Sequence, residues 1–136
     1  MNRIFLDTNF IMDLLAREGD FQANAIKVLE IGASKKIKFY VSFLTLANFA
    51  YITRKDSKEN LFDNLKTCCR LFTVIPNEKS QLINSINLNP NDLEDAIQFE
   101  CAKSEKCECI ITRDPEGFEF SSIPIISPVE FINQFQ

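Results

Sequence analysis

The sequence contains no histidine in its 136 residues. This absence excludes serine–histidine–aspartate triads, acid–base catalysis by histidine and histidine ligands to a metal. If the protein is a hydrolase, its chemistry must therefore come from carboxylates. Carboxylate oxygens are the ligands that hard divalent cations prefer, so a hydrolase of this composition is expected to use such a cation.

The sequence also lacks a long hydrophobic run. No apolar segment approaches the roughly 18 residues that a membrane-spanning helix needs. Asp7 and Asp13 interrupt the apolar stretch near the N-terminus, which argues against a signal peptide. We therefore expect a cytoplasmic protein with no membrane association.

Cysteines are few and show no paired spacing. Their count of five is odd, and positions 68, 69, 101, 107 and 109 contain no CxxC pair. Reduced thiols packed in the core are the favoured interpretation. A zinc site built from scattered thiolates is the weaker alternative, because histidine is absent as well.

Basic residues do not dominate the chain, whose net charge is −4. This charge argues against a protein that coats nucleic acid non-specifically, but it leaves room for an enzyme that holds a few phosphates locally. Two small basic clusters occur, and a solubilising role is the favoured interpretation of both: Lys35, Lys36 and Lys38, and Arg54, Lys55 and Lys58.

Short apolar runs alternate with helical patterns along one domain, residues 1–136. The runs predict strands at 3–6, 38–42, 71–76, 109–112 and 124–127. The helical patterns predict helices at 8–17, 21–34, 43–55, 57–70, 78–88, 93–105 and 128–134. The strongly apolar helix at 43–55 is expected to be buried over much of its surface. This alternation predicts an α/β fold with a mostly parallel five-stranded sheet covered on both faces.

Acidic residues follow the strands at the places where such a sheet binds its ligands. Asp7 ends the run IFLD, and Asp114 follows the fourth strand in CIITRD. If these two strands are neighbours, their carboxylates converge at one edge of the sheet. Asp92 and Asp95 begin the helix at 93–105, and a carboxylate in a first helical turn points near the same edge.

Each of these acids also has an ordinary structural explanation. Asp7 and Asp92 are good helix caps, Asp95 favours the helix dipole, and Asp114 with Pro115 is typical of a turn. Together, however, they place several carboxylates at one end of the sheet without a basic partner in the local sequence. Such repulsion is costly unless a cation is bound. Arg113 is the nearest residue that could neutralise them, and it could instead point outward or meet a phosphate.

The segments IFLDTNFIMDLL, FLTLANFAYIT, DLEDAIQFECA and IITRDPEGF together resemble a PIN domain, in particular the small single-domain toxins of bacterial toxin–antitoxin pairs. The resemblance covers nearly the whole chain and depends on the order and intervals of DTN, DLEDA and TRD. It implies a three-layer α/β/α sandwich and a metal-dependent endoribonuclease that uses Mg²⁺ or Mn²⁺. It also implies an RNA substrate, a possible cognate antitoxin protein and a homodimer.

The resemblance assigns roles by position. Asp7, Asp95 and Asp114 match the catalytic, metal-binding acids of the family. The residues expected to support them are Thr8, Asn9, Asp92 and Thr112, and Arg113 is expected to bind a phosphate. One position departs from the pattern, because Asn48 stands in SFLTLAN where the family usually has a glutamate. Asparagine can offer a carbonyl oxygen to a cation, but it carries no charge, so weaker metal binding would follow.

Three other functions agree with parts of this pattern to different degrees. A degenerate PIN domain could bind RNA or a protein with weak or no catalysis, which Asn48 and the acidic composition favour. A receiver-like signalling domain also has acids at strand ends, but no acceptor aspartate ends the third strand and no lysine follows the fifth. A phosphatase of the DxD class fails, because Asp7 is followed by Thr8 and Asn9 rather than by a second aspartate two positions on.

Overall fold

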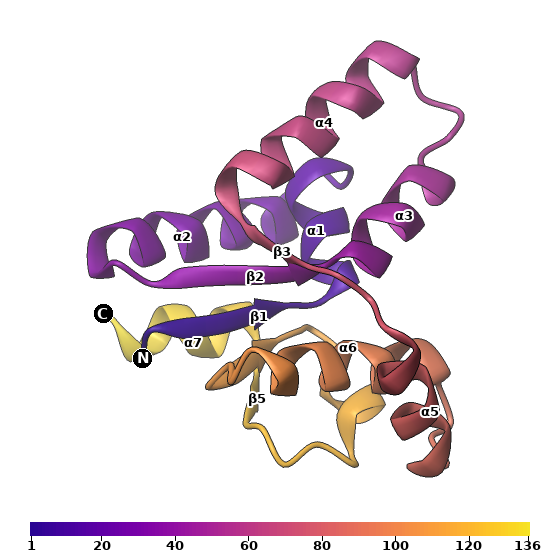
Figure 1. The fold of residues 1–136 in the computed structure, drawn as a ribbon. Helices are drawn as coiled ribbons and strands as arrows, with labels where there is room; N and C mark the ends of the chain where they lie inside the picture. Colours follow the sequence, from indigo (N-terminus) through magenta and orange to yellow (C-terminus); the bar gives the residue numbers. More distant parts are fainter.

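A computed structural model describes residues 1–136 and contains a single parallel sheet at its centre (Figure 1). The sheet order is β3-β2-β1-β4-β5, and every neighbouring pair is parallel. The predicted sheet is therefore confirmed, and it is parallel throughout. The strands are β1 (Arg3–Leu6), β2 (Lys38–Ser42), β3 (Thr73–Ile75), β4 (Cys109–Ile111) and β5 (Ile125–Ile126).

All seven predicted helices form, with ends shifted by a few residues. They are α1 (Thr8–Leu15), α2 (Asp20–Lys35), α3 (Phe43–Ile52), α4 (Lys58–Leu71), α5 (Lys79–Asn87), α6 (Leu93–Ser104) and α7 (Pro128–Gln134). A short 3-10 helix, η1 (Pro115–Phe118), follows β4. Local caps account for several of the helix starts, for example Ser42 before α3 and Ser57 before α4, whose side chains accept hydrogen bonds from backbone amides.

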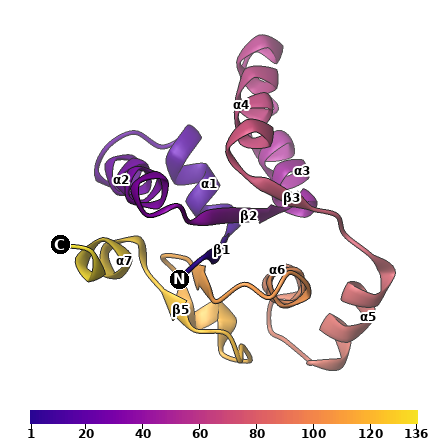
Figure 2. The ribbon, with the colours of Figure 1, turned by 60° about the vertical axis from the view of Figure 1, so that its left-hand side comes forward.

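The sheet separates two hydrophobic layers, because alternate side chains of each strand point to opposite faces. In β1, Ile4 and Leu6 pack in the layer formed with α1, α2 and α7, whereas Phe5 packs against α6 on the other face. Figure 2 shows α1, α2 and α7 on one side of the strands and α6 on the other. The three-layer α/β/α arrangement is therefore confirmed.

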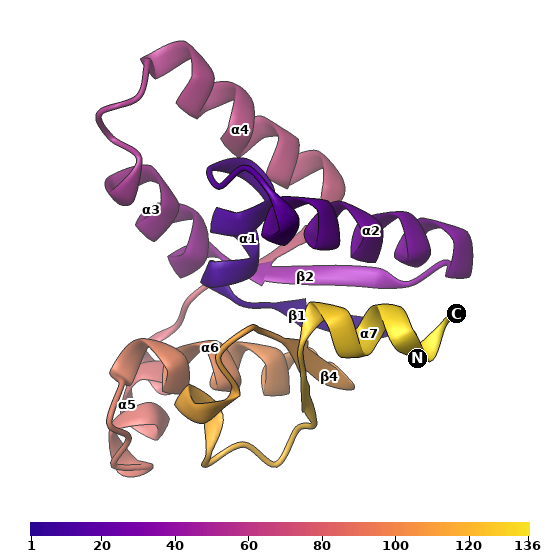
Figure 3. The ribbon, with the colours of Figure 1, turned by 180° about the vertical axis from the view of Figure 1, so that it is seen from behind.

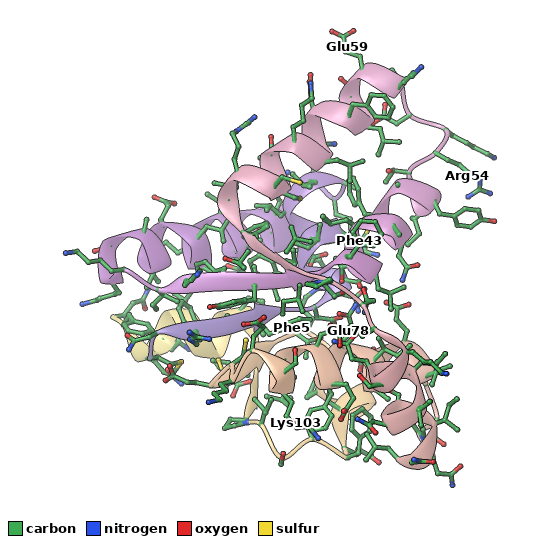
Figure 4. All side chains as sticks on the ribbon, in the orientation of Figure 1. Phe5, Phe43, Arg54, Glu59, Glu78 and Lys103 are labelled. Carbon is green, nitrogen blue, oxygen red and sulfur yellow. The ribbon has the colours of Figure 1, made fainter.

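The expectation that the helix at 43–55 is mostly buried is wrong. Thr45, Leu46 and Phe49 are buried, but Phe43 and Tyr51 are 60% and 65% exposed. The cause is tertiary: α3 and α4 form an arm that extends beyond the sheet, so their outer surfaces have no layer over them (Figure 2). Figure 4 shows Arg54 and Glu59 near the outer end of this arm, far from Phe5.

The cysteines agree with the interpretation that most of them are free thiols packed in the core. All five cysteines are free, and only Cys69 is exposed. Burial raises the pKa of the thiols of Cys101, Cys107 and Cys109 to about 12, so these thiols are protonated and unreactive at neutral pH. No helix has both the length and the apolar character needed to cross a membrane.

Candidate active site

The two strands that lead to Asp7 and Asp114 are direct neighbours in the sheet. Leu6 of β1 pairs with Ile111 of β4, and the amide of Asp7 donates a hydrogen bond to the carbonyl of Ile111 at 3.2 Å. The residues that follow the two strands therefore leave the sheet side by side. The expectation that these two strands are neighbours is therefore confirmed, which is what convergence of the carboxylates of Asp7 and Asp114 requires.

Thr112 connects the two exits. Its hydroxyl donates a hydrogen bond to Oδ2 of Asp7 at 2.7 Å and accepts one from the amide of Asp114 at 3.0 Å. Because Thr112 is fully buried, this link is shielded from water. One side chain thus fixes the orientation of the Asp7 carboxylate and the start of the segment that carries Asp114.

Asp7 is both a helix cap and a buried acid. Its Oδ1 accepts a hydrogen bond from the amide of Thr8 at 2.6 Å at the start of α1, and the residue is only 3% exposed. Burial raises the pKa of Asp7 to about 6, and the nearby carboxylates of Glu94 and Asp114 add to this effect, while the hydrogen bonds from Thr112 and Thr8 oppose it. A buried carboxylate held this way favours a cation close to it.

The first turn of α6 brings a second perturbed acid to the same edge. Asp92 caps the helix by accepting a hydrogen bond from the amide of Asp95 at 3.2 Å. Burial, together with the carboxylates around it, Asp92 and Asp7 first among them, raises the pKa of Asp95 to about 7. Because the charge of Asp7 acts on Asp95, the two acids belong to one electrostatic cluster.

Glu94 is a fifth carboxylate at this edge, after Asp7, Asp92, Asp95 and Asp114, and the sequence did not single it out. Thr8 donates a hydrogen bond from Oγ1 to Oε1 of Glu94 at 3.1 Å. Thr8 therefore contacts Glu94 rather than the carboxylate of Asp7, to which it gives only its backbone amide. Glu94 lies next to Asp95 in DLEDA, so its place in the first helical turn was the available signal.

Beneath these acids lies a buried polar network that the sequence also did not indicate. Gln98 donates from Nε2 to the hydroxyls of Thr8 and Thr45 at 2.9 and 2.7 Å, and its Oε1 accepts from Ser42 at 2.7 Å. No buried side-chain nitrogen or oxygen in the structure lacks a partner. This network ties α1, α3 and α6 together directly below the candidate site.

The remaining predicted residues differ in their surroundings. Asn9 is half-buried in the first turn of α1. Asn48 is half-buried on α3, one turn beyond Thr45. Asp114 is exposed at the start of η1. No hydrogen bond joins the side chain of Asn9 or Asn48 to one of the acids.

The set of donors fits a hard divalent cation. Asp7, Asp95, Glu94 and Asp114 offer only oxygen atoms, and no lysine or arginine forms an ion pair with any of them. In the structure no three of these side chains lie close enough together to hold a metal ion. Repulsion among the carboxylates contributes to the raised pKa values of Asp7 and Asp95.

Comparison with known proteins identifies the family. Residues 3–116 match the PIN domain family. The chain belongs to the PIN domain family. A curated relative of this PIN domain is Ribonuclease VapC1 from Aquifex aeolicus (strain VF5), which is 24% identical over 138 residues, covering 98% of this chain and 95% of the relative.

Solved structures share the fold of this PIN domain. VapBC2 from Rickettsia felis, bound to a DNA fragment from its promoter, superimposes with a TM-score of 0.74 at 16% identity, covering 92% of this chain and 98% of the other. VapC20 from Mycobacterium tuberculosis, described as a sarcin–ricin loop cleaving toxin, gives a TM-score of 0.65 at 15% identity, covering 89% and 98% of the two chains.

Arg113 of this PIN domain is engaged by a buried acid outside the cluster. Its Nη2 donates to Oδ1 of Asp13 at 3.0 Å, and its Nε donates to the other oxygen of the same carboxylate. Asp13 is 1% exposed, and this ion pair raises the pKa of Arg113 above its usual value. Arg113 therefore forms its ion pair with Asp13, and the carboxylates of Asp114 and Asp7 act on its guanidinium only through space.

A close packing contact positions Asp95 in this PIN domain, and it yields a prediction. A Cβ on Gly117 of η1 would overlap Oδ2 of Asp95, so the absence of a side chain at Gly117 gives the carboxylate its place. We expect Gly117→Ala to turn the Asp95 carboxylate aside and to weaken Mn²⁺ binding roughly tenfold, as loss of a supporting contact does at metal sites. Isothermal titration calorimetry with Mn²⁺ measures this.

Stability should change little in Gly117→Ala, because the overlapping atom is the end of a side chain that can rotate. Glu116→Ala is the matched control, since Glu116 is exposed in the same turn. Equal Mn²⁺ dissociation constants for wild type and Gly117→Ala would show that Gly117 does not position Asp95.

Proposed function

We propose that this PIN domain is a divalent-metal-dependent endoribonuclease that hydrolyses RNA phosphodiester bonds, with Mg²⁺ or Mn²⁺ as its cofactor. The observation that carries the proposal is the group of carboxylates at the exits of β1 and β4 and in the first turn of α6, with which no basic side chain forms an ion pair. The name of the relative, Ribonuclease VapC1, supports the same activity.

Each residue contributes in a way that follows from its surroundings. Asp7, Asp95 and Asp114 would hold the cation, which when bound supplies a Lewis acid and lowers the pKa of water. Thr112 keeps the Asp7 carboxylate oriented through its 2.7 Å hydrogen bond. Attack of water on phosphorus and departure of the 3′ oxygen would leave 5′-phosphate and 3′-hydroxyl ends.

The direct test is cleavage of labelled single-stranded RNA by the purified protein. We expect cleavage with Mn²⁺ or Mg²⁺, no cleavage with EDTA, and recovery when the cation is restored in excess. Product ends identified with phosphatase and ligase should carry 5′-phosphate and 3′-hydroxyl groups. Cleavage that continues in EDTA, or its absence with both cations at every concentration tried, would contradict the proposal.

The alternative function is a degenerate PIN domain that binds RNA or a protein without efficient catalysis, and Asn48 is the residue that favours it. Asn48 lacks the negative charge of the glutamate that is usual at this position in the family, and the carboxylate of Glu94 would supply a negative charge in its place. Thr45, one turn before Asn48, shares a 2.8 Å hydrogen bond with Thr8, and Thr8 contacts Glu94. A carboxylate on α3 at position 48 and the carboxylate of Glu94 would therefore approach the site from neighbouring elements.

A pair of substitutions separates the two functions. We expect Glu94→Gln to weaken Mn²⁺ binding about tenfold, and Asn48→Glu in the same protein to recover most of that loss, because the second change restores the missing charge. Calorimetric titration with Mn²⁺ measures both effects, and Glu119→Gln, at an exposed acid, is the control. An Mn²⁺ affinity unaffected by all of these changes would favour the degenerate PIN domain.

We also propose a cognate antitoxin as a partner and a homodimeric assembly. Support comes from neighbours that are themselves complexes, including a toxin–antitoxin complex from Klebsiella pneumoniae, which has a TM-score of 0.68 and 22% identity. Exposed apolar side chains that could form these contacts lie on α3 and on the outlying helix α5: Phe43, Tyr51, Ile52, Leu82, Ile83 and Ile86. Sedimentation of the protein alone, and with an antitoxin encoded beside it, tests both assemblies.

A further inference from the structure

A cavity beside the candidate active site has a composition that the metal chemistry does not explain. It has a volume of about 250 Å³ and is lined by Phe21, Asn24, Arg113, Ser127, Pro128 and Val129. Its walls are the starts of α2 and α7, which lie side by side (Figures 1 and 3), and the segment that leaves β4. The volume is somewhat below the range of drug-sized ligand pockets, so it suits a single flat ring system.

The cavity shares a wall with the candidate site. Arg113 lies between Thr112, whose hydroxyl holds the Asp7 carboxylate, and Asp114. A chain that placed a phosphate on the acids at the exits of β1 and β4 would therefore have its neighbouring residue at the mouth of this cavity.

The guanidinium in the wall is held firmly by a buried carboxylate. Arg113 and Arg17 both bond the single buried carboxylate of Asp13, with Arg17 at 3.1 Å. Two guanidinium groups thus share one carboxylate, so Asp13 does not neutralise both of them. Arg113 keeps N–H donors that Asp13 does not use, and these can meet a phosphate oxygen.

An aromatic ring stands beside this cation. The guanidinium carbon of Arg113 lies 3.8 Å from the centre of the Phe21 ring, and Phe21 is still 49% exposed. A large exposed aromatic ring backed by a fixed guanidinium is a platform on which a base can stack. Asn24 adds an amide in the same wall, which can donate to and accept from the edge of a base.

From these observations we infer that the cavity formed by Phe21, Asn24 and Arg113 binds one unstacked base of a single-stranded RNA substrate, beside the phosphate that is cleaved. The inference rests on the proposed ribonuclease function and deepens it. Phe21 stacks on the base, Arg113 contacts the adjoining phosphate, and Asn24 reads the edge of the base. The substrate must be single-stranded there, since a paired base cannot enter the cavity.

Binding to a protein that cannot cleave is the appropriate measurement. We would introduce Phe21→Ala, Phe21→Tyr and Phe62→Ala into the Asp7→Asn protein and measure the anisotropy of a labelled oligonucleotide RNA. Phe62 on α4 is a matched control, because its ring is 47% exposed and has the ammonium of Lys58 5.6 Å from its centre. We expect Phe21→Ala to weaken RNA binding by about 5-fold to 150-fold, as loss of one base–aromatic stack does. Phe21→Tyr and Phe62→Ala should bind as the parent does.

An abasic scan distinguishes stacking from a general effect on the surface. RNAs that lack the base at one position in turn should bind the parent protein more weakly at one position next to the cleavage site. The RNA that lacks the base at that position and the complete RNA should bind equally to the Phe21→Ala protein, because the stack is already gone.

Two outcomes would contradict these proposals, and they differ from each other. Equal binding of the parent and Phe21→Ala proteins to the complete RNA, with cleavage by wild type intact, would overturn the base-binding subsite but not the ribonuclease function. An absence of both RNA binding and RNA cleavage by wild type would overturn the proposed function itself.

Discussion

Asp7→Asn is expected to reduce RNA cleavage by more than about 100-fold with Mn²⁺ or Mg²⁺, because it removes the charge of the most buried acid in the cluster. Asp7 is central to the site. Thr112 orients its carboxylate, its Oδ1 caps α1 by accepting a hydrogen bond from the amide of Thr8, and its charge contributes to the raised pKa of Asp95. Single-turnover cleavage rates over a range of cation concentrations measure the effect. The same titrations separate a lost cation from a lost chemical step, since excess cation rescues only the former.

The fold should survive this substitution. Asparagine is nearly the same shape as aspartate, and in the metal-free protein it removes a carboxylate whose burial is unfavourable. We expect the thermal midpoint of metal-free Asp7→Asn to be no lower than that of wild type at pH 7.5. Asp63→Asn, at an exposed position of α4, is the control for the substitution itself. Cleavage by Asp7→Asn within a few-fold of the Asp63→Asn rate would exclude Asp7 from the reaction.

The second large effect concerns pH. The pKa of Asp7 is raised to about 6 and that of Asp95 to about 7, so below these values both acids carry protons that a cation must displace. Between pH 5.5 and pH 7.5, loss of these two protons should raise the Mn²⁺ affinity by roughly 100-fold. Calorimetric titrations at both pH values measure the change. Proton release at the lower pH, detected from the dependence of the binding enthalpy on the buffer, should accompany it.

The stability of the metal-free protein should change in the opposite direction. A carboxyl whose pKa is higher in the folded state than in the unfolded state binds more protons when folded, so its contribution to stability falls as pH rises. For Asp7 the window runs from its ordinary pKa of 3.8 to about 6, and the loss across the whole titration is roughly 3 kcal/mol. Urea unfolding of wild type and Asp7→Asn at several pH values isolates this contribution. A wild-type stability that rises relative to the variant between pH 4.5 and pH 7 would contradict the assignment.

The sequence predicted the sheet well because local patterns determine it. Runs such as RIFL and KFYVS are short, apolar and bounded by polar residues, and alternation with helical patterns leaves a parallel sheet as the simple arrangement. The order of strands was not available from such patterns. That β1 and β4 are neighbours, although more than a hundred residues separate Leu6 from Ile111, is a property of the assembled sheet.

The arm and the arginine illustrate what local patterns miss. The segment FLTLANFAYIT is apolar enough to be taken for a buried helix, yet Phe43 and Tyr51 are exposed because α3 extends past the sheet. Arg113 is adjacent in sequence to Asp114, yet its guanidinium bonds Asp13 on α1. In both cases the outcome depends on which distant element lies nearby, and no window of sequence contains that information.

By itself, the sequence determined which chemical groups the site can use. It contains no histidine, it has carboxylates at the ends of strands, and it has an asparagine where a glutamate is usual in the family. Only the tertiary structure decided which carboxylates share an environment. It added Glu94 to the cluster, assigned Arg113 to Asp13 and opened a cavity between α2 and α7. The physical reason is that charge interactions and burial depend on distances through space, and these are set by the packing of elements far apart in the chain.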